Sequence, residues 1–220
     1  MPIHPKTLKK IKNNSITELA IVGRSPELNA SDMEILAEAL EGNTKLEALM
    51  LCTNDIRDEG AKILAQALKK LPNIKSLDVS VNNLGDEGAM ALLSLNTLSW
   101  LDIAGNNIGT NGIVPIRDNS SLNSLIIDNN KLDDNSAILF LKNKTLTELI
   151  LYDNNISAGV MEQVEKHIQE NKDRFDKKPP KLHIDTAGIF PSKSPPSSSG
   201  DKHSDCAAHT PHSPKEIEVR

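Results

Sequence analysis

Two aspartates, Asp78 and Asp102, occupy the same position in consecutive copies of a repeated sequence pattern. If the two copies form adjacent parallel strands in register, their carboxylates lie within about 5 Å of each other. Like charges placed opposite each other cost on the order of a few tenths of a kcal/mol when they are solvated. A lysine- or arginine-bearing partner would relieve this repulsion. We prefer that interpretation to a bound cation or to two simply solvated aspartates.

Paired carboxylates can also perform general acid–base catalysis. The shallow, open face of a sheet cannot exclude water, so we expect no enzymatic activity. Cys52 has no histidine at a neighbouring position and no helix N-terminus nearby, which favours an inert thiol over a nucleophile. Four residues of types that can bind zinc recur every third position near the end of the chain, at His203, Cys206, His209 and His212. One cysteine with histidines in a flexible segment is a poor site, and we expect no metal and no cofactor.

The only tryptophan and the only tyrosine, Trp100 and Tyr152, fall at positions that alternate with the inward leucines. Core packing does not account for them, because leucine and isoleucine already fill the inward positions. An apolar stripe edged by carboxylates, with aromatic anchors, is typical of a protein interface. The alternative is that these side chains only stiffen the sheet by cross-strand contact. The predicted partner-binding residues are Trp100, Tyr152, Met50, Asp78, Asp102, Ile126, Asp128 and Ile150.

A repeated unit must position these residues, and its clearest copy is LEALMLCTNDIRDEGAKILAQAL at residues 46–68. The same spacing of leucine and isoleucine returns at Ile74, Leu98, Leu122 and Leu146. Such self-similarity indicates a solenoid, in which each unit buries its apolar face against its neighbours. The spacing falls from 28 to 24 residues, a loss of about one helical turn. The later units should therefore hold only a short helix or a 3₁₀ turn, as Pro115 also indicates.

The ends of the repeat array need separate treatment. The sequence predicts three segments. They are an N-terminal cap over residues 1–15, the repeat domain over residues 16–187, and a disordered tail rich in proline, serine and histidine over residues 188–220. In the first repeat we expect a helix from Ser31, with a capping box to Glu34. The last helix should run over about residues 157–174, and Leu182 and Ile184 could form a final edge strand.

Composition narrows the functional classes. Residues 1–176 carry 18 Lys/Arg against 25 Asp/Glu, which argues against nucleic-acid binding. No apolar run is long enough to cross a membrane, and we see neither a secretory leader nor a disulfide framework in two distant cysteines. We expect a cytoplasmic monomer.

The phrases NDIRDEGAKILAQAL and NNLGDEGAMALL, each after an LxxLxL-type strand, resemble the leucine-rich repeats of the ribonuclease-inhibitor type over residues 16–175. The resemblance implies a right-handed α/β solenoid of about six repeats plus caps, with a concave parallel sheet and convex helices. It also implies that positions one, four and six of LxxLxLxxN point inward and that the asparagine bonds the turn backbone. That asparagine returns at residues 54, 82, 106, 130 and 154.

The mixture of 28- and 24-residue units is also similar to stand-alone repeat proteins that intracellular bacterial pathogens deliver into host cells, which would imply secretion into the host cytosol. The predicted function is a protein–protein interaction module whose partner is basic and apolar. One alternative is regulation of a small GTPase, because the activators of Ran share this repeat type, with Arg24 or Asn82 as candidate residues. The other is a purely structural scaffold.

Overall fold

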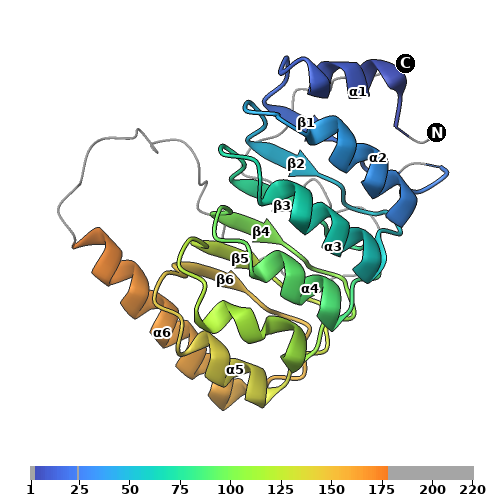
Figure 1. Ribbon diagram of the computed structural model, residues 1–220. Helices are drawn as coiled ribbons and strands as arrows, with labels where there is room; N and C mark the ends of the chain where they lie inside the picture. Colours follow the sequence, from blue (N-terminus) through green and yellow to red (C-terminus); the bar gives the residue numbers. More distant parts are fainter. Residues whose placement is uncertain (1–2, 24, 178–220) are drawn as a thin grey trace.

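The computed structural model describes residues 3–23 and 25–177 and shows an arc of parallel strands with helices along one face (Figure 1). The sheet has six strands in the order β1-β2-β3-β4-β5-β6, all neighbours being parallel. The strands are β1 Glu18–Ala20, β2 Ala48–Met50, β3 Ser76–Asp78, β4 Trp100–Asp102, β5 Ser124–Ile126 and β6 Glu148–Ile150. The helices are α1 Pro5–Lys12, α2 Ala30–Leu40, α3 Arg57–Leu68, α4 Asp86–Leu93, the 3₁₀ helix η1 Thr110–Arg117, α5 Asp134–Phe140 and α6 Ala158–Asp176. The predicted α/β solenoid is confirmed.

The strand register agrees with the predicted columns. The central residue of every strand is a leucine that points into the core, and five of these six leucines are buried. Asp78 pairs with Asp102 and Ile126 pairs with Ile150. Since successive side chains of a strand point to opposite faces, the residues on either side of each leucine lie on the face without helices.

A row of asparagines holds successive turns together. The Nδ2 of Asn106 donates to the carbonyls of Ile103, 2.9 Å away in its own repeat, and of Val79, 3.3 Å away in the repeat before. Its Oδ1 accepts from the backbone N–H of Asn82 and of Leu84, each at 3.0 Å. One side chain thereby satisfies buried backbone groups that the bend of the chain leaves unpaired. The equivalent residues Asn54, Asn82, Asn130 and Asn154 make corresponding bonds.

A second asparagine row lies at the turns that precede the strands, and the sequence analysis missed it. Asn119 donates to the carbonyls of Leu93 and Leu95 and accepts from the N–H of Leu122. Asn43 and Asn143 make equivalent hydrogen bonds, in which the side-chain amide donates to a backbone carbonyl and the side-chain oxygen accepts from a backbone N–H. The signal was present, because each of these asparagines stands three residues before the first leucine or isoleucine of a repeat.

The Asp-x-Gly motif of the repeats joins one helix to the next. The N-cap residue of α4 is Gly85, which has no side chain that could cap the helix. Asp58 of α3 takes this role, because its carboxylate accepts from the N–H of Gly85 at 2.7 Å and from the N–H of Gly88 at 2.9 Å. A Cβ on Gly88 would meet Asp58 Oδ1 at 2.6 Å. In the next repeat, Asp86 Oδ1 accepts from the N–H of Gly109, the N-cap of η1, at 2.6 Å. Helices α3 and α4 therefore each cap the helix of the following repeat, and glycine permits the close approach.

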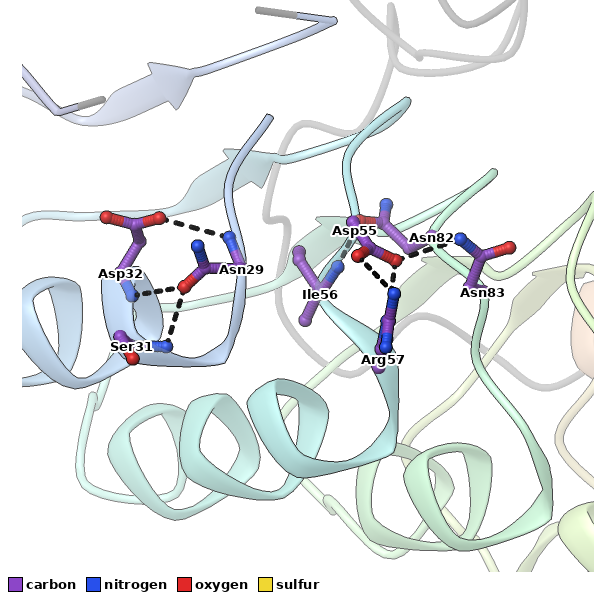
Figure 2. A network of polar contacts seen from close by, with 8 residues as sticks. All are labelled: Asn29, Ser31, Asp32, Asp55, Ile56, Arg57, Asn82 and Asn83. Atoms are coloured by element: carbon purple, nitrogen blue, oxygen red, sulfur yellow. Dashed lines mark hydrogen bonds and ion pairs between the residues drawn. The ribbon is translucent and has the colours of Figure 1, made fainter. Parts of the chain in front are cut away.

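The helix boundaries correct one prediction and confirm another. Helix α2 begins after Asn29, whose side chain caps it in a capping box with Asp32, not at Ser31 with Glu34 (Figure 2). Asn29 has the extended backbone that an N-cap requires, and Ser31 is already the second helical residue. The short helices of the later repeats are confirmed: α4 has 8 residues, and η1, which contains Pro115, is a 3₁₀ helix.

Helix α1 packs against α2 and buries Ile3 and Ile11 at the start of the array. At the other end α6 runs beside α5 and β6, with Val164 buried. The proposed edge strand at Leu182 and Ile184 and the tail over residues 188–220 lie outside the described residues, so the domain boundaries stay a prediction. Over residues 3–23 and 25–177, the helices are each too short or too polar to cross a membrane.

Candidate binding site on the concave face

The predicted site residues on β2 to β6 alternate with the inward leucines, which places them on the sheet face opposite the helices. One row crosses β2 to β6 with a single residue from each strand. The row reads Met50, Asp78, Asp102, Ile126 and Ile150. The apolar stripe expected from sequence is therefore not continuous, because the two aspartates separate Met50 from the isoleucines.

An apolar cluster separate from the main core occupies one half of this face. It consists of Trp100, Ala104 and Ile126, with the partly buried Ile150 packed against it. Tyr152, which we expected beside Trp100, lies outside this cluster and is 55% exposed. The structure therefore brings Trp100 together with the two isoleucines and leaves Tyr152 projecting at the end of β6.

The aspartates are buried, which disagrees with the alternative that Asp78 and Asp102 are simply solvated groups. Their exposed fractions are 0% and 1%, and that of Trp100 is 5%. Both carboxylates turn back onto their own strand. Asp78 Oδ1 accepts from the N–H of Ser80 at 2.9 Å and from its hydroxyl at 2.7 Å, and Asp102 Oδ1 accepts from the N–H of Ala104 at 2.9 Å. Such bonding two residues ahead is the Asx turn that short acidic side chains favour at strand ends.

Burial raises the pKa of Asp102 well above its usual value, and the neighbouring charges of Asp78 and Asp128 raise it further. The hydrogen bond from Ala104 opposes this effect but does not outweigh it. A cationic group that reached this position would be attracted by Asp78 and would favour the ionised form of Asp102.

Ser124 adds a further polar group to this face. It pairs with Trp100 across the strands, is 1% exposed, and its hydroxyl has no hydrogen-bond partner among the residues that the structure describes. A buried hydroxyl without a partner is uncommon in folded proteins, because burying it unsatisfied is unfavourable. Over the described part of the chain, three or more His, Cys, Asp or Glu residues nowhere gather in a way that could hold a metal ion.

Cys52 is buried and disulfide-bonded, which corrects our expectation that the two distant cysteines form no disulfide framework. The spacing of two distant cysteines in a sequence carries no information about whether their side chains meet in the fold. The other cysteine of the chain, Cys206, lies outside the described residues, as do the histidines at 203, 209 and 212.

The loop edge of the sheet carries a charged network that the sequence analysis did not single out (Figure 2). Arg57 binds Asp55 through Nε at 2.8 Å and Nη2 at 2.7 Å, and the Asn83 amide donates to Asp55 at 2.9 Å. The hydrogen bond from Arg57 is the main reason that the pKa of Asp55 is lowered. Asn82, the residue we named for GTPase regulation, is instead buried, and its amide bonds the carbonyls of Leu51 and Ser80. Arg24 lies outside the described residues.

Comparison with known proteins supports the fold. The profile described as "Leucine Rich repeat" matches residues 42–65, 70–93 and 94–116. Among solved structures, the "Leiomodin-1 Actin-Binding Site 2 (ABS2)" structure is 22% identical, with a TM-score of 0.50 over 80% of this chain and 94% of that chain. The Caenorhabditis elegans tropomodulin C-terminal domain is 15% identical, with a TM-score of 0.52 over 77% of this chain and 93% of that chain. The search of curated proteins gives no significant match. The matched repeats and the two structures agree with the strand register in identifying the fold of this chain as a leucine-rich repeat solenoid.

Proposed function

We propose that this chain is a protein-recognition module that binds one partner protein on its concave face. The observation that carries the proposal is the apolar cluster of Trp100, Ala104 and Ile126 on the face of the sheet that bears no helix. A solenoid needs apolar side chains between sheet and helices, but it gains no core from a second cluster on the opposite face. Aromatic residues in a desolvated setting are the usual energetic centre of a protein interface.

The partner that fits this face combines apolar side chains with lysine or arginine. The apolar side chains would pack on Trp100 and Ile126, and a cationic group would sit between Asp78 and Asp102. The raised pKa of Asp102 supports this assignment, because it marks a place where negative charge is poorly solvated. The proposed partner-binding set keeps Met50, Asp128, Ile150 and the exposed Tyr152 as the edges of the same surface.

Two finer assignments narrow the search for that partner. The leiomodin structure with the similar fold is described as an actin-binding site, and we therefore place actin first among the proteins to be tested. The similarity to stand-alone repeat effectors of the ribonuclease-inhibitor type would make the partner a host cytosolic protein. In either setting we propose that the chain acts as a monomer in a cytoplasm and without enzymatic activity of its own.

The test is affinity capture by the full chain under reducing conditions, first with purified actin and then with cytosolic lysate. The wild-type chain is compared with the double variant Trp100→Ala, Tyr152→Ala. The matched control is Ile138→Ala on α5, a residue that is 52% exposed on the helical side. All three chains must first show the same circular dichroism spectrum.

A protein retained by the wild type and by Ile138→Ala but lost by the double variant supports the proposal and identifies the partner. Equal retention by all three chains would move recognition away from the concave face and contradict the proposal. Stimulated GTP hydrolysis across a panel of small GTPases would instead favour the regulatory alternative. A purely structural scaffold predicts that substitutions on the concave face change none of these measurements.

A further inference from the structure

Three exposed apolar side chains occupy the same position in consecutive repeats on the helical side of the solenoid. Met90 of α4 is 42% exposed, Val114 of η1 is 43% exposed and Ile138 of α5 is 52% exposed. They follow one another at intervals of 24 residues, the length of these repeats. Because α4 packs against η1 and η1 against α5, the three side chains form one row on the outer surface, which we call the convex row.

The repeat itself does not require an apolar residue at this position. The equivalent residues of the other repeats are Glu34 on α2, Lys62 on α3 and Glu162 on α6. The core is also filled without the convex row, because the residue that precedes each of its members is buried. These preceding residues are Ala89, Ile113 and Ala137.

The residue types of the row also conflict with an exposed place on a helix. Valine and isoleucine are branched at Cβ and lose side-chain freedom in a helix, whereas glutamate and lysine are good helix formers. Val114 and Ile138 therefore serve neither the local helix preference nor the core. Single exposed apolar residues are ordinary, but a contiguous row that breaks the local rules marks an interaction site.

The spacing of the convex row selects the shape of its partner. Packed helices lie about 8–10 Å apart, so the row presents one apolar group at about that interval. An α-helix rises about 1.5 Å per residue, and its residues i, i+7 and i+14 lie on one side at steps of about 10.5 Å. A strand covers about 10 Å in three residues, but the third side chain then points to the opposite face. A helix laid across α4, η1 and α5 therefore contacts all three members, and an extended segment does not.

The edge of the row toward the helix starts is acidic. Its exposed groups stand three residues before the members of the row and are Glu87, Asn111 and Asn135. Glu87 makes an ion pair with Lys62 of α3, and Glu59 stands one turn before Lys62 on the same side of that helix. Two carboxylates therefore face one ammonium group at this edge.

The edge toward the helix ends is basic. Arg117 of η1 and Lys142, which follows α5, are exposed, and Arg117 pairs with Asp118 through Nη2 at 2.6 Å. Two cations and one anion leave this edge positive. A partner helix with Lys or Arg along one side of its apolar stripe and Asp or Glu along the other matches both edges. Such complementarity fixes the direction in which the helix lies, because reversing it would bring like charges together.

We propose that the convex row of Met90, Val114 and Ile138 docks an amphipathic helix of a second partner protein, with apolar residues at heptad spacing between a basic and an acidic side. This surface is separate from the concave face to which the proposed function belongs. Since the two surfaces lie on opposite sides of the sheet, one chain holds both partners at once and acts as an adaptor between them.

The probe for the test is a phage-displayed library of helical peptides about three heptads long, with the residues of one side randomised. The full wild-type chain selects from this library, and the dissociation constants of the enriched peptides are measured by fluorescence anisotropy. The variant Met90→Gln, Ile138→Gln removes two apolar side chains and keeps a residue type that favours a helix. The matched control is Glu34→Gln, Glu162→Gln, at the same position of the repeat outside the row.

Enriched peptides should carry apolar residues at heptad spacing with basic and acidic residues on opposite sides of them. They should bind the wild type and the control equally, and the Met90→Gln, Ile138→Gln variant about tenfold or more weakly, because two apolar contacts are lost. Exchanging the acidic and basic sides of the best peptide should weaken its binding to the wild type several-fold.

A selection that enriches no peptide, or peptides that bind the variant as tightly as the wild type, would overturn the proposal. Sedimentation velocity and flotation with anionic vesicles test the other occupants. Self-association or vesicle binding that Met90→Gln, Ile138→Gln abolishes would assign the row to a second copy of the chain or to a lipid surface, and so contradict a docked helix. A partner of the concave face responds instead to Trp100→Ala, Tyr152→Ala, so the two proposals succeed or fail separately.

Discussion

Asp102 shows at the scale of a single residue how a buried carboxylate on the proposed binding face can oppose stability. Its carboxylate is buried and its pKa is raised, first by burial and then by the charge of Asp78. A raised folded-state pKa means that the ionised carboxylate disfavours folding at every pH above its ordinary value of 3.8. The stabilising effect of the protonated form is complete below that value and is lost as the pH rises through the folded pKa.

We therefore expect Asp102→Asn to be at least as stable as the wild type at neutral pH and to lose this advantage below about pH 3.8. The asparagine oxygen can still accept from the N–H of Ala104. Urea unfolding over a pH series measures the difference. Glu148→Gln, an exposed residue of β6, is the control for removing a charge from the same sheet. A variant that is less stable than the wild type at pH 7 would show that Asp102 is held by a partner charge rather than left poorly solvated.

The asparagine rows give a second prediction at this scale. Asn106→Ala should lower the free energy of unfolding by more than about 2 kcal/mol, because each buried backbone group left without a partner costs about 1–3 kcal/mol. Asn106 contacts the backbone of both its own repeat and the preceding one. The neighbouring Asn107 is exposed, so Asn107→Ala should change little. Equal losses in urea unfolding of the two variants would contradict the proposed bridging role.

At the scale of elements, carboxylates of α3 and α4 each cap the helix of the next repeat. Asp58→Ala should destabilise α4 more than Glu59→Ala, since only Asp58 accepts from the N-terminal N–H groups of α4. Loss of an N-cap carboxylate costs about 0.5–2 kcal/mol of stability. Gly88→Ala should also destabilise, because the added Cβ would meet Asp58 Oδ1 at 2.6 Å and Ala61 Cβ at 3.1 Å. Thermal unfolding of the three variants ranks them by their loss of stability. Stabilisation by Gly88→Ala would show that α3 and α4 can move apart freely.

At the scale of the whole molecule, the helices and strands of the described residues contact only their neighbours, so a perturbation at one end should fade along the array. Ile11 of α1 is fully buried at the first end. Ile11→Ala should cost about 2–5 kcal/mol locally. Hydrogen exchange should speed up in β1 and β2 well before β5 and β6. Uniform acceleration across all six strands would show that the array unfolds as one unit instead.

The repeat pattern by itself determined the architecture. Leucines at fixed spacing have one way to be buried together, so the strands, their register and the outward columns followed from period and alternation. The loss of one helical turn and the presence of Pro115 likewise predicted the short helices of the later repeats. Within the candidate site, the adjacency of Asp78 with Asp102 and of Ile126 with Ile150 was predictable for the same reason.

Only the tertiary structure decided how those outward residues are solvated. Alternation assigns Asp102 and Trp100 to a face, but their exposure depends on neighbours far away in the sequence. The same holds for Asp58, whose capping role needs the next helix at close range, and for Cys52, whose disulfide needs a distant thiol. Periodicity is a local property of a chain, whereas desolvation, capping between repeats and disulfide pairing arise from contacts between distant segments, which local pattern does not encode.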